Sequence, residues 1–386
     1  MGALLLVSAL IAFAAISSAR VSKWNDQGMI TPDKVFALAP PKPYPVIDVH
    51  THLEPTPRAY DIAVRVMDAA GIAMSVNLSG ASGKDLDKHL ALAARYPRRF
   101  ITFCGVSIKG RQWKARDLGE EIARSLQQSH KQGAAGFGEI VNWDSRRIAW
   151  DDPRLEPMWS KLEDLRMPIN WHVGEPSRRW RPEGPFNTLE APSLLGKGPL
   201  KMELLNRQER VLERHPKLIV IAAHTNFLVD MLPPMVYRFE KYPNYHVDLC
   251  AAFEEFGRVP EEFTDICRMY GDRIFYGTDA VYWKDHIKGD KAARVAHYKA
   301  FYLAHFLFLG TGQRMIPVPF SGNYGRYFIG WENGFTRYAH DGVSLSDSIL
   351  RKIYYRNAEK LFGVKVEGRK SPKGLSFETP FAVRKL

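Results

Sequence analysis

Short apolar runs alternate with longer amphipathic stretches along most of this chain, beginning at Val46. The runs have the length and β-branched content of buried strands, and the stretches between them carry apolar residues at helical spacing. Strands are expected at 46–51, 73–78, 100–108, 135–140, 168–173, 218–224, 245–250 and 274–278. Helical stretches include 115–132, 153–166 and 260–270. Eight alternations over about 230 residues predict an α/β fold of the (β/α)8 TIM-barrel type, with a doubly wound parallel sheet as the alternative.

The pattern changes after the eighth run. Residues 282–345 form a long aromatic-rich stretch, in which Phe301–Phe308 is too densely aromatic for one face and therefore predicts a buried helix. We expect an insertion over or beside the barrel mouth, serving as a lid or as a dimer contact. A last helix at 346–362 is expected to complete the barrel, which then spans 46–363, and 364–386 form a tail.

The first residues follow a different pattern. Ala3 to Ile16 are apolar apart from Ser8, and small residues follow up to Ala19. This pattern is typical of a secretory signal peptide and is too short for a comfortable membrane span. Residues 1–19 are therefore expected to be removed, leaving a secreted or periplasmic protein without a membrane span. No Lys or Arg precedes the apolar run, so an uncleaved anchor stays open. Residues 20–45 contain five prolines and predict an extended lead-in.

The composition and net charge limit which kinds of binding partner are expected. The 386 residues are 45% hydrophobic and 25% charged, which is ordinary for a soluble protein. The net charge is +12, but the basic residues are spread along the chain, so a nucleic-acid partner is not favoured over a small, possibly carboxylate-bearing substrate. Three scattered cysteines form no disulfide framework and no zinc-ribbon spacing, and each is expected as a buried thiol.

Candidate chemistry lies at the ends of the predicted strands. In VIDVHTHL, His50 and His52 are two residues apart and so project to the same face of the strand. His172, His224 and Asp279 end the fifth, sixth and eighth runs. The carboxyl ends of barrel strands meet at one mouth, and imidazole and carboxylate are the usual ligands of catalytic zinc. A buried side chain of this kind costs several kcal/mol unless it is paired or metal-bound. The pattern predicts a divalent metal site, with zinc as the expected ion.

Four further side chains are singled out, and three of them have two interpretations each. Glu139 ends the fourth run, where it could bridge or bind a metal, or accept a hydrogen bond from a metal-bound histidine. Asp48 lies deeper than His50 and predicts a structural hydrogen bond. Arg178 could bind a substrate carboxylate, or be solvated. Asn226 could touch substrate or cap the next helix. The other histidines lack ligand spacing and are expected at the surface or in ordinary packing, at 89, 130, 215, 246, 286, 297, 305 and 340.

The set of motifs resembles the amidohydrolase superfamily, and more narrowly the group that includes aminocarboxymuconate-semialdehyde decarboxylase and related aromatic-acid decarboxylases. The matching segments are IDVHTHL, the segment ending at His172, AAHTN, YGTDA and the closing RKIYYRNAEKLFG. The resemblance implies that His50, His52, His172 and Asp279 bind one metal ion, usually zinc. It further implies that His224 is the acid–base group beside that ion. Asp279 could also accept a proton from the attacking water.

Four functions are compatible with this site. Hydrolysis of an ester, lactone or amide is the first expectation, which the predicted export favours slightly. Non-oxidative decarboxylation of an aromatic or unsaturated carboxylic acid on the same metal site is the alternative. A two-metal nuclease of the TatD type is suggested by Glu139 and the positive charge, but the basic residues form no concentrated stripe. A non-catalytic binding protein is the fourth. A homodimer is also considered.

Overall fold

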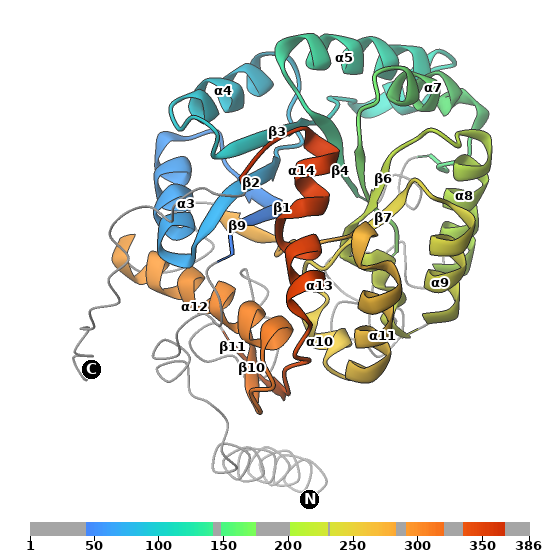
Figure 1. Cartoon of the computed structure of the whole chain (residues 1–386). Coiled ribbons are helices and arrows are strands. Elements are labelled where there is room, and N and C mark those ends of the chain that lie inside the picture. Colours follow the sequence, from blue (N-terminus) through green and yellow to red (C-terminus); the bar gives the residue numbers. More distant parts are fainter. Residues whose placement is uncertain are drawn as a thin grey trace, which may run out of the picture.

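The computed structural model describes residues 44–141, 148–174, 201–230, 232–282, 291–319 and 335–366. Parallel strands form one sheet that curls into a ring with helices around it, in the order β8-β7-β6-β5-β4-β3-β2-β1-β9 (Figure 1). The strands are β1 (Val46–Leu53), β2 (Ile72–Leu78), β3 (Phe100–Cys104), β4 (Gly136–Val141), β5 (Ile169–His172), β6 (Val220–Ala222), β7 (Tyr245–Asp248), β8 (Ile274–Phe275) and β9 (Ala280–Tyr282).

The ring closes through a single interrupted segment. β8 pairs with β7, β9 pairs with β1, and the two strands are consecutive in the chain. Between them the backbone stays attached to β1, because Val49 N donates to Tyr276 O at 2.9 Å and Asp279 N donates to His50 O at 2.8 Å. The predicted (β/α)8 barrel is therefore confirmed. The continuous strand expected at 274–278 is wrong, because the regular strand ends at Phe275 and the chain reaches a positive φ of 62° at Asp279.

Helices follow the strands in the expected alternation. They are α3 (Pro57–Ala70), α4 (Gly83–Ala94), α5 (Leu118–Gln132), α7 (Glu156–Asp164), α8 (Lys201–Arg214), α9 (Leu232–Lys241), α10 (Phe253–Phe256) and α11 (Pro260–Tyr270). Short 3₁₀ turns lie at Gly110–Lys114, Pro153–Leu155, Ala223–Asp230 and Gly271–Arg273. α3 illustrates the local rules: Thr56 Oγ1 accepts from Ala59 N, proline opens the helix, and Gly71 ends it at φ 78°.

The hydrophobic core fills the space between the sheet and the helices. Trp171 of β5 is fully buried, as expected from its alternation with His172. It stacks on Trp159 of α7, with ring centroids 4.8 Å apart, and meets the edge of Trp150 at 5.3 Å. The three cysteines are free and buried, as predicted. Burial of this rigid layer fixes where the strands end, and therefore where the polar side chains at their ends lie.

The stretch after β9 packs beside the barrel. α12 (Lys291–Gly310) lies against α3, and β10 (Ile316–Pro319) pairs antiparallel with β11 (Phe335–His340) (Figure 1). The side chains of 301–308 are buried, which confirms the predicted buried helix. α13 (Asp347–Arg351), a π-helical turn (Lys352–Arg356) and α14 (Asn357–Phe362) together form the predicted last helix. A lid or dimer role for the insertion stays a prediction.

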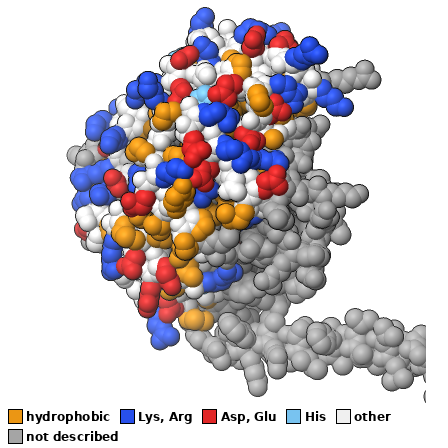
Figure 2. Space-filling view, turned by 90° about the vertical axis from the view of Figure 1, so that its right-hand side faces the viewer, with side chains coloured by type: hydrophobic (Ala, Val, Ile, Leu, Met, Phe, Trp, Pro, Cys, Tyr) orange, Lys and Arg blue, Asp and Glu red, His pale blue; other side chains and the backbone are white. Residues whose placement is uncertain are grey.

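Several predictions fall outside the described residues. They concern the signal peptide at 1–19, most of the lead-in, most of the tail, and Arg178. Within the part of the chain that is described, no helix combines the length and apolar character needed to cross a membrane. On the face shown in Figure 2, acidic side chains are interspersed among the basic ones, so the net positive charge does not gather into a single patch there.

Candidate metal centre

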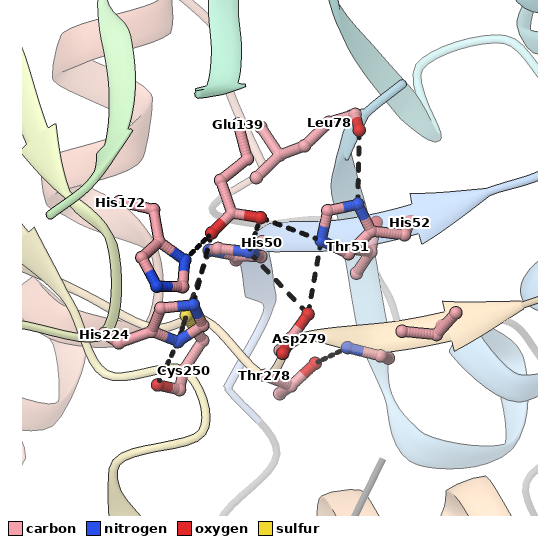
Figure 3. A network of polar contacts seen from close by, with 12 residues as sticks. His50, Thr51, His52, Leu78, Glu139, His172, His224, Cys250, Thr278 and Asp279 are labelled. Carbon is pink, nitrogen blue, oxygen red and sulfur yellow. Dashed lines mark hydrogen bonds and ion pairs between the residues drawn. The ribbon is translucent and has the colours of Figure 1, made fainter. Parts of the chain in front are cut away.

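Six polar side chains from distant parts of the chain meet at the carboxyl ends of the strands (Figure 3). They are His50 and His52 of β1, Glu139 of β4, His172 of β5, His224 just after β6, and Asp279 between β8 and β9. The fold thus brings together the residues that the strand-end pattern in the sequence singled out. Their roles as ligands or acid–base groups stay predictions.

The two histidines of β1 present the same ring nitrogen to the centre. His50 is fully buried, and its Nδ1 lies 2.9 Å from Asp248 Oδ2. His52 lies nearer the mouth, and its Nδ1 is 3.2 Å from the carbonyl oxygen of Leu78. Both partners can only accept, so Nδ1 donates in each ring and Nε2 is the nitrogen left to face a metal. The strand thereby supplies two imidazole nitrogens in the form that binds a metal.

Those two nitrogens and two carboxylate oxygens outline a cage. Glu139 Oε2 lies 3.7 Å from His50 Nε2 and 3.5 Å from His52 Nε2. Asp279 Oδ1 lies 3.8 Å and 3.2 Å from the same two atoms. Ligand atoms held at about 2.1 Å from one ion in tetrahedral geometry lie about 3.4 Å from each other. His50, His52 and Glu139 each offer one ligand atom within 4.8 Å of the other two, which suits one divalent ion, and Asp279 Oδ1 lies beside the two imidazole nitrogens of this group.

Glu139 joins this cage to the other two histidines. Its Oε1 is 2.6 Å from His172 Nδ1 and 3.2 Å from His224 Nε2. Burial raises the pKa of Glu139, but the neighbouring His172 and His50 outweigh burial and hold the pKa well below its usual range. The geometry gives Glu139 a place among the candidate ligands that its sequence position left open. His172, which the resemblance gives as a ligand, faces Glu139 through Nδ1, and its own contact with a metal stays a prediction.

His224 reaches the centre through an uncommon turn. The strand expected to extend to His224 ends at Ala222, and the next residues bend sharply. Four consecutive residues, 224–227, have φ between 48° and 56°, where L-residues pay about 1–2 kcal/mol each. Phe227 then packs flat on the His224 ring, with centroids 4.8 Å apart and planes at 13°. The turn replaces a strand end and holds the imidazole beside Glu139.

Asn226 lies in the same turn but points elsewhere. Its Nδ2 donates to Gln208 Oε1 of α8 at 2.8 Å and to the hydroxyl of Tyr245 at 2.9 Å. These buried contacts tie the turn to α8 and β7, and they are not helix-cap bonds. The capping interpretation is therefore wrong, because no regular helix begins at this turn. A substrate contact by Asn226 stays a prediction.

Two buried residues at the end of β7 were missed by the sequence analysis. Asp248 contacts the His50 ring, and Cys250 Sγ lies 2.9 Å from His50 Nδ1 and 3.0 Å from His224 Nδ1. Asp248 ends an apolar run in the same way as Asp279, so the reasoning applied to Asp279 could have found it. Cys250 offered no comparable signal, because a thiol is at home in an apolar run.

Asp48 lies below the centre, as expected for a structural group. Its carboxylate accepts from the hydroxyls of Thr278 at 2.6 Å and Tyr302 at 2.7 Å, and from His50 N at 3.1 Å. Burial raises the pKa of Asp48 to about 6 even though these donors lower it. The predicted structural hydrogen bond is confirmed: Asp48 fastens β1, the segment before Asp279, and α12 to one another.

The chain is similar to a known protein family and to several solved structures. A sequence profile of the family described as Amidohydrolase matches residues 47–364. Among solved structures, an uncharacterised TIM-barrel protein from Bordetella bronchiseptica aligns at 16% identity and a TM-score of 0.49, covering 83% of this chain and 99% of that chain. Among curated proteins, none matches this chain.

Two decarboxylases also align. A dihydroxybenzoic acid decarboxylase from Polaromonas, solved with manganese and the inhibitor 2-nitroresorcinol, aligns at 16% identity and a TM-score of 0.49, covering 83% of this chain and 97% of its own. A 5-carboxyvanillate decarboxylase from Novosphingobium aromaticivorans, solved with manganese and 4-hydroxy-3-methoxy-5-nitrobenzoic acid, aligns at 17% identity and a TM-score of 0.46, covering 83% and 96%. These activities and ligands are properties of those proteins.

Proposed function

The chain belongs to the amidohydrolase family, and on this premise we propose that it is a metal-dependent enzyme that removes CO₂ from a small aromatic or unsaturated carboxylic acid. The sequence alone favoured hydrolysis, with decarboxylation second. The arrangement around His224 supports reversing that order, because decarboxylation needs only the proton donor that His224 suits, whereas hydrolysis also needs a group that accepts a proton from water.

We propose that His50, His52, Glu139 and Asp279 hold the ion, since His50, His52 and Glu139 offer ligand atoms close enough to share one divalent metal and Asp279 Oδ1 lies within 3.8 Å of both imidazole nitrogens. Nitrogen and carboxylate oxygen donors suit zinc or manganese. A bound divalent ion acts as a Lewis acid that draws electron density from a substrate oxygen. Asp279 and His52 are the most exposed of the four, with side chains 20% and 17% accessible, so the substrate would enter from their side.

The observation that carries the proposal is the pair of acceptors around His224. Its Nδ1 lies 3.0 Å from the carbonyl oxygen of Cys250, and its Nε2 lies 3.2 Å from Glu139 Oε1. A carbonyl and an ionised carboxylate can only accept, so this environment suits an imidazole that donates from both nitrogens. Phe227 covers one face of the ring, which leaves the Nε2 edge directed at the centre. His224 is therefore suited to be a general acid.

Decarboxylation needs such an acid and no base for attack by water. The bond between the substrate carbon and its carboxyl group breaks, the electron pair stays on that carbon, and CO₂ leaves. His224 Nε2 gives its proton to the carbon, so the carboxyl group is replaced by hydrogen and no electrons are gained or lost overall. Water from the mouth then restores the proton on His224. The buried floor formed by His50, Asp48 and their partners keeps other water away from the reacting carbon.

Hydrolysis is the second candidate, favoured by one specific contact set. Asp279 Oδ1 lies on the open side of the cage, 3.2 Å from His52 Nε2. A carboxylate in that place could accept a proton from an attacking water, after which His224 would protonate the leaving group. The substrate would then be an ester, lactone or amide.

One experiment separates the two reactions. The purified full-length protein, loaded with Zn²⁺ or Mn²⁺, is incubated with 2,6-dihydroxybenzoate-type acids while CO₂ release is measured, and in parallel with p-nitrophenyl esters and lactones. The proposal predicts metal-dependent CO₂ release that EDTA abolishes. Turnover of esters or lactones without CO₂ release from any acid would instead establish the second candidate. His224→Ala serves as the control, because it should remove either activity without removing the metal.

A further inference from the structure

We infer that Asp248, together with Cys250, is a positioning group that sets the orientation of both His50 and His224 from the end of β7. The inference rests on the proposed function for what those rings do. It extends that function by assigning a role to two residues that contact the outer nitrogen of His50 and are not among the four proposed ligands.

Asp248 is completely buried and surrounded by donors. Its Oδ2 accepts from His50 Nδ1 at 2.9 Å and from Asn170 Nδ2 at 3.0 Å. Its Oδ1 accepts from the backbone N–H of His224 at 2.9 Å, and from the thiol of Cys250 at 2.7 Å. The backbone N–H of Cys250 adds a fifth, longer contact at 3.4 Å. A buried carboxylate persists when donors surround it in this way. The two oxygens therefore serve different histidines.

The first oxygen determines how His50 meets the centre. A carboxylate accepts and does not donate, so Nδ1 of His50 donates to it, and Nε2 is left as the nitrogen that can offer a lone pair to a metal. Nε2 is the atom that faces Glu139 and Asp279. Without the contact to Asp248, the ring could carry its proton on Nε2 instead, and that nitrogen would then be unable to bind a metal.

The second oxygen fastens the turn that carries His224. His224 is the first of the four residues with positive φ, and its backbone N–H is the group that Asp248 holds. Each such residue costs about 1–2 kcal/mol, so the turn needs contacts of this kind to persist. Cys250 lies two residues after Asp248, and its backbone carbonyl accepts from the ring Nδ1 of His224. The end of β7 thus holds both the backbone and the ring of His224.

Cys250 completes the arrangement through its side chain. The thiol hydrogen points to Asp248 Oδ1, and the sulfur lies between the Nδ1 atoms of His50 and His224. The sulfur fills the gap between the two rings, and its hydrogen keeps Asp248 turned so that Oδ2 faces His50. Serine could preserve the donor, whereas alanine would remove it.

The test measures Mn²⁺ binding to the metal-free full-length protein by electron paramagnetic resonance, with thermal unfolding recorded for every variant. Asp248→Asn is expected to weaken Mn²⁺ binding by about 10–100-fold, as is typical when the partner of a metal-binding histidine is changed. Cys250→Ala should weaken it by about threefold or more, and Cys250→Ser should restore most of the loss. Cys267→Ser, a change of the buried thiol of α11, is the matched control and should leave binding unchanged.

The outcomes separate this inference from the proposed function. Wild-type affinity in a folded Asp248→Asn protein would overturn the positioning role while leaving the metal-dependent function intact. If the wild type itself binds no divalent ion, the proposed function fails and the inference fails with it. If Asp248→Asn does not fold, the comparison of Cys250→Ala with Cys250→Ser decides: equal Mn²⁺ affinity in these two variants overturns the inference, and a difference of about threefold or more supports it. In an active wild type, Asp248→Asn should also lower kcat far more than it changes KM.

Discussion

The strand ends and α12 both bury histidines, and they do so in opposite electrostatic surroundings. At the strand ends, burial lowers the pKa of His50, but Cys250, Asp248 and Glu139 outweigh burial and raise the pKa well above its usual value. In α12, burial alone dominates and lowers the pKa of His305 to about 3, with only the carbonyl of Phe301 to accept from its ring at 2.8 Å. Burial is alike in the two regions. At these two positions the charge of the partners decides whether the pKa of a buried histidine is raised or lowered.

The comparison extends to His89 of α4. Its Nδ1 contacts the hydroxyl of Tyr60 at 3.0 Å and the amide of Asn77 at 3.1 Å, both neutral groups. Burial lowers its pKa to about 4. Surface or ordinary packing was expected for His89 and His305, and both are buried, with no hydrogen bond to a carboxylate within the described residues. The nearby carboxylate of Asp85 raises the pKa of His89 but does not outweigh burial. Because the partners of these histidines differ, changes at the strand ends are expected to affect metal binding and activity, and changes in the packed regions are expected to affect stability.

The largest effect is expected for Asp279→Ala. This change removes one of the four cage atoms and a group beside the substrate, so both metal and activity should be lost, with kcat/KM reduced by about a thousandfold or more. Elemental analysis and turnover measure the two losses together. Asp68→Asn, at a surface ion pair with Arg99, is the control and should keep both. A fully active, metal-loaded Asp279→Ala protein would remove this residue from the site.

His224→Ala should separate metal binding from turnover. The ring lies outside the four-atom cage, so the metal content should stay near that of the wild type. Loss of a general acid should lower kcat by about 10²–10³-fold. The same preparation is analysed for metal content and for single-substrate kinetics. Full activity in this variant would refute the division of labour between His224 and the cage.

At the packing histidine His305, a fall in pH is expected to lower the free energy of unfolding and to leave the activity of the site unaffected. His305 has a folded-state pKa of about 3, below the unfolded value near 6.5, so the unfolded chain binds the extra proton first as the pH falls. The free energy of unfolding should therefore fall by about 1.4 kcal/mol for each pH unit below 6.5, and be independent of this group above that pH.

Urea unfolding at pH 7.5 and pH 5.0 measures this loss. His305→Gln should lose about 2 kcal/mol less than the wild type between the two pH values, because glutamine does not titrate. His130→Gln, at the exposed end of α5, is the control and should behave like the wild type. Equal losses in wild type and His305→Gln would contradict the assignment of His305 to the neutral, packing class.

The smallest effect is expected for Tyr302→Phe, which tests how firmly the two regions are joined. The Tyr302 hydroxyl of α12 donates to Asp48 beneath the centre. Its loss should cost about 1–2 kcal/mol of stability, with metal content unchanged. Chemical unfolding measures the cost, and Arg65→Ala, at an exposed ion pair with Asp61, should cost less than about 0.5 kcal/mol. A loss of metal in Tyr302→Phe would mean that α12 belongs to the site itself.

Much of the site could be predicted because strand ends in a barrel share one rim. His50, His52, His172 and Asp279 lie on or directly beside strands whose apolar pattern is plain in the sequence. The match to the amidohydrolase family over 47–364 confirms the resemblance that these motifs carried. The same reasoning left Glu139 open, because its position on β4 does not say which way each carboxylate oxygen points.

What the sequence could not reveal depends on local backbone geometry. None of the residues of the left-handed turn at 224–227 is glycine, so the sequence carries no sign of it. The turn depends instead on packing and on the contact with Asp248. The interruption of the last strand before Asp279 depends on contacts to β1 and Asp48, which are distant in sequence. Asp248 could be singled out as a polar residue at a strand end, but its contacts with His50 and the backbone of His224 depend on the fold. Arg178 and the leader at 1–19 lie outside the described residues and stay predictions.

The most direct test counts divalent ions in the purified protein. Elemental analysis of the wild type should find about one zinc or manganese per chain, and the double change His50→Ala with Glu139→Gln should remove it while the protein stays folded. A wild type with no divalent ion, or a double variant that keeps its full complement, would contradict a single cation held between β1, β4 and the residue before β9.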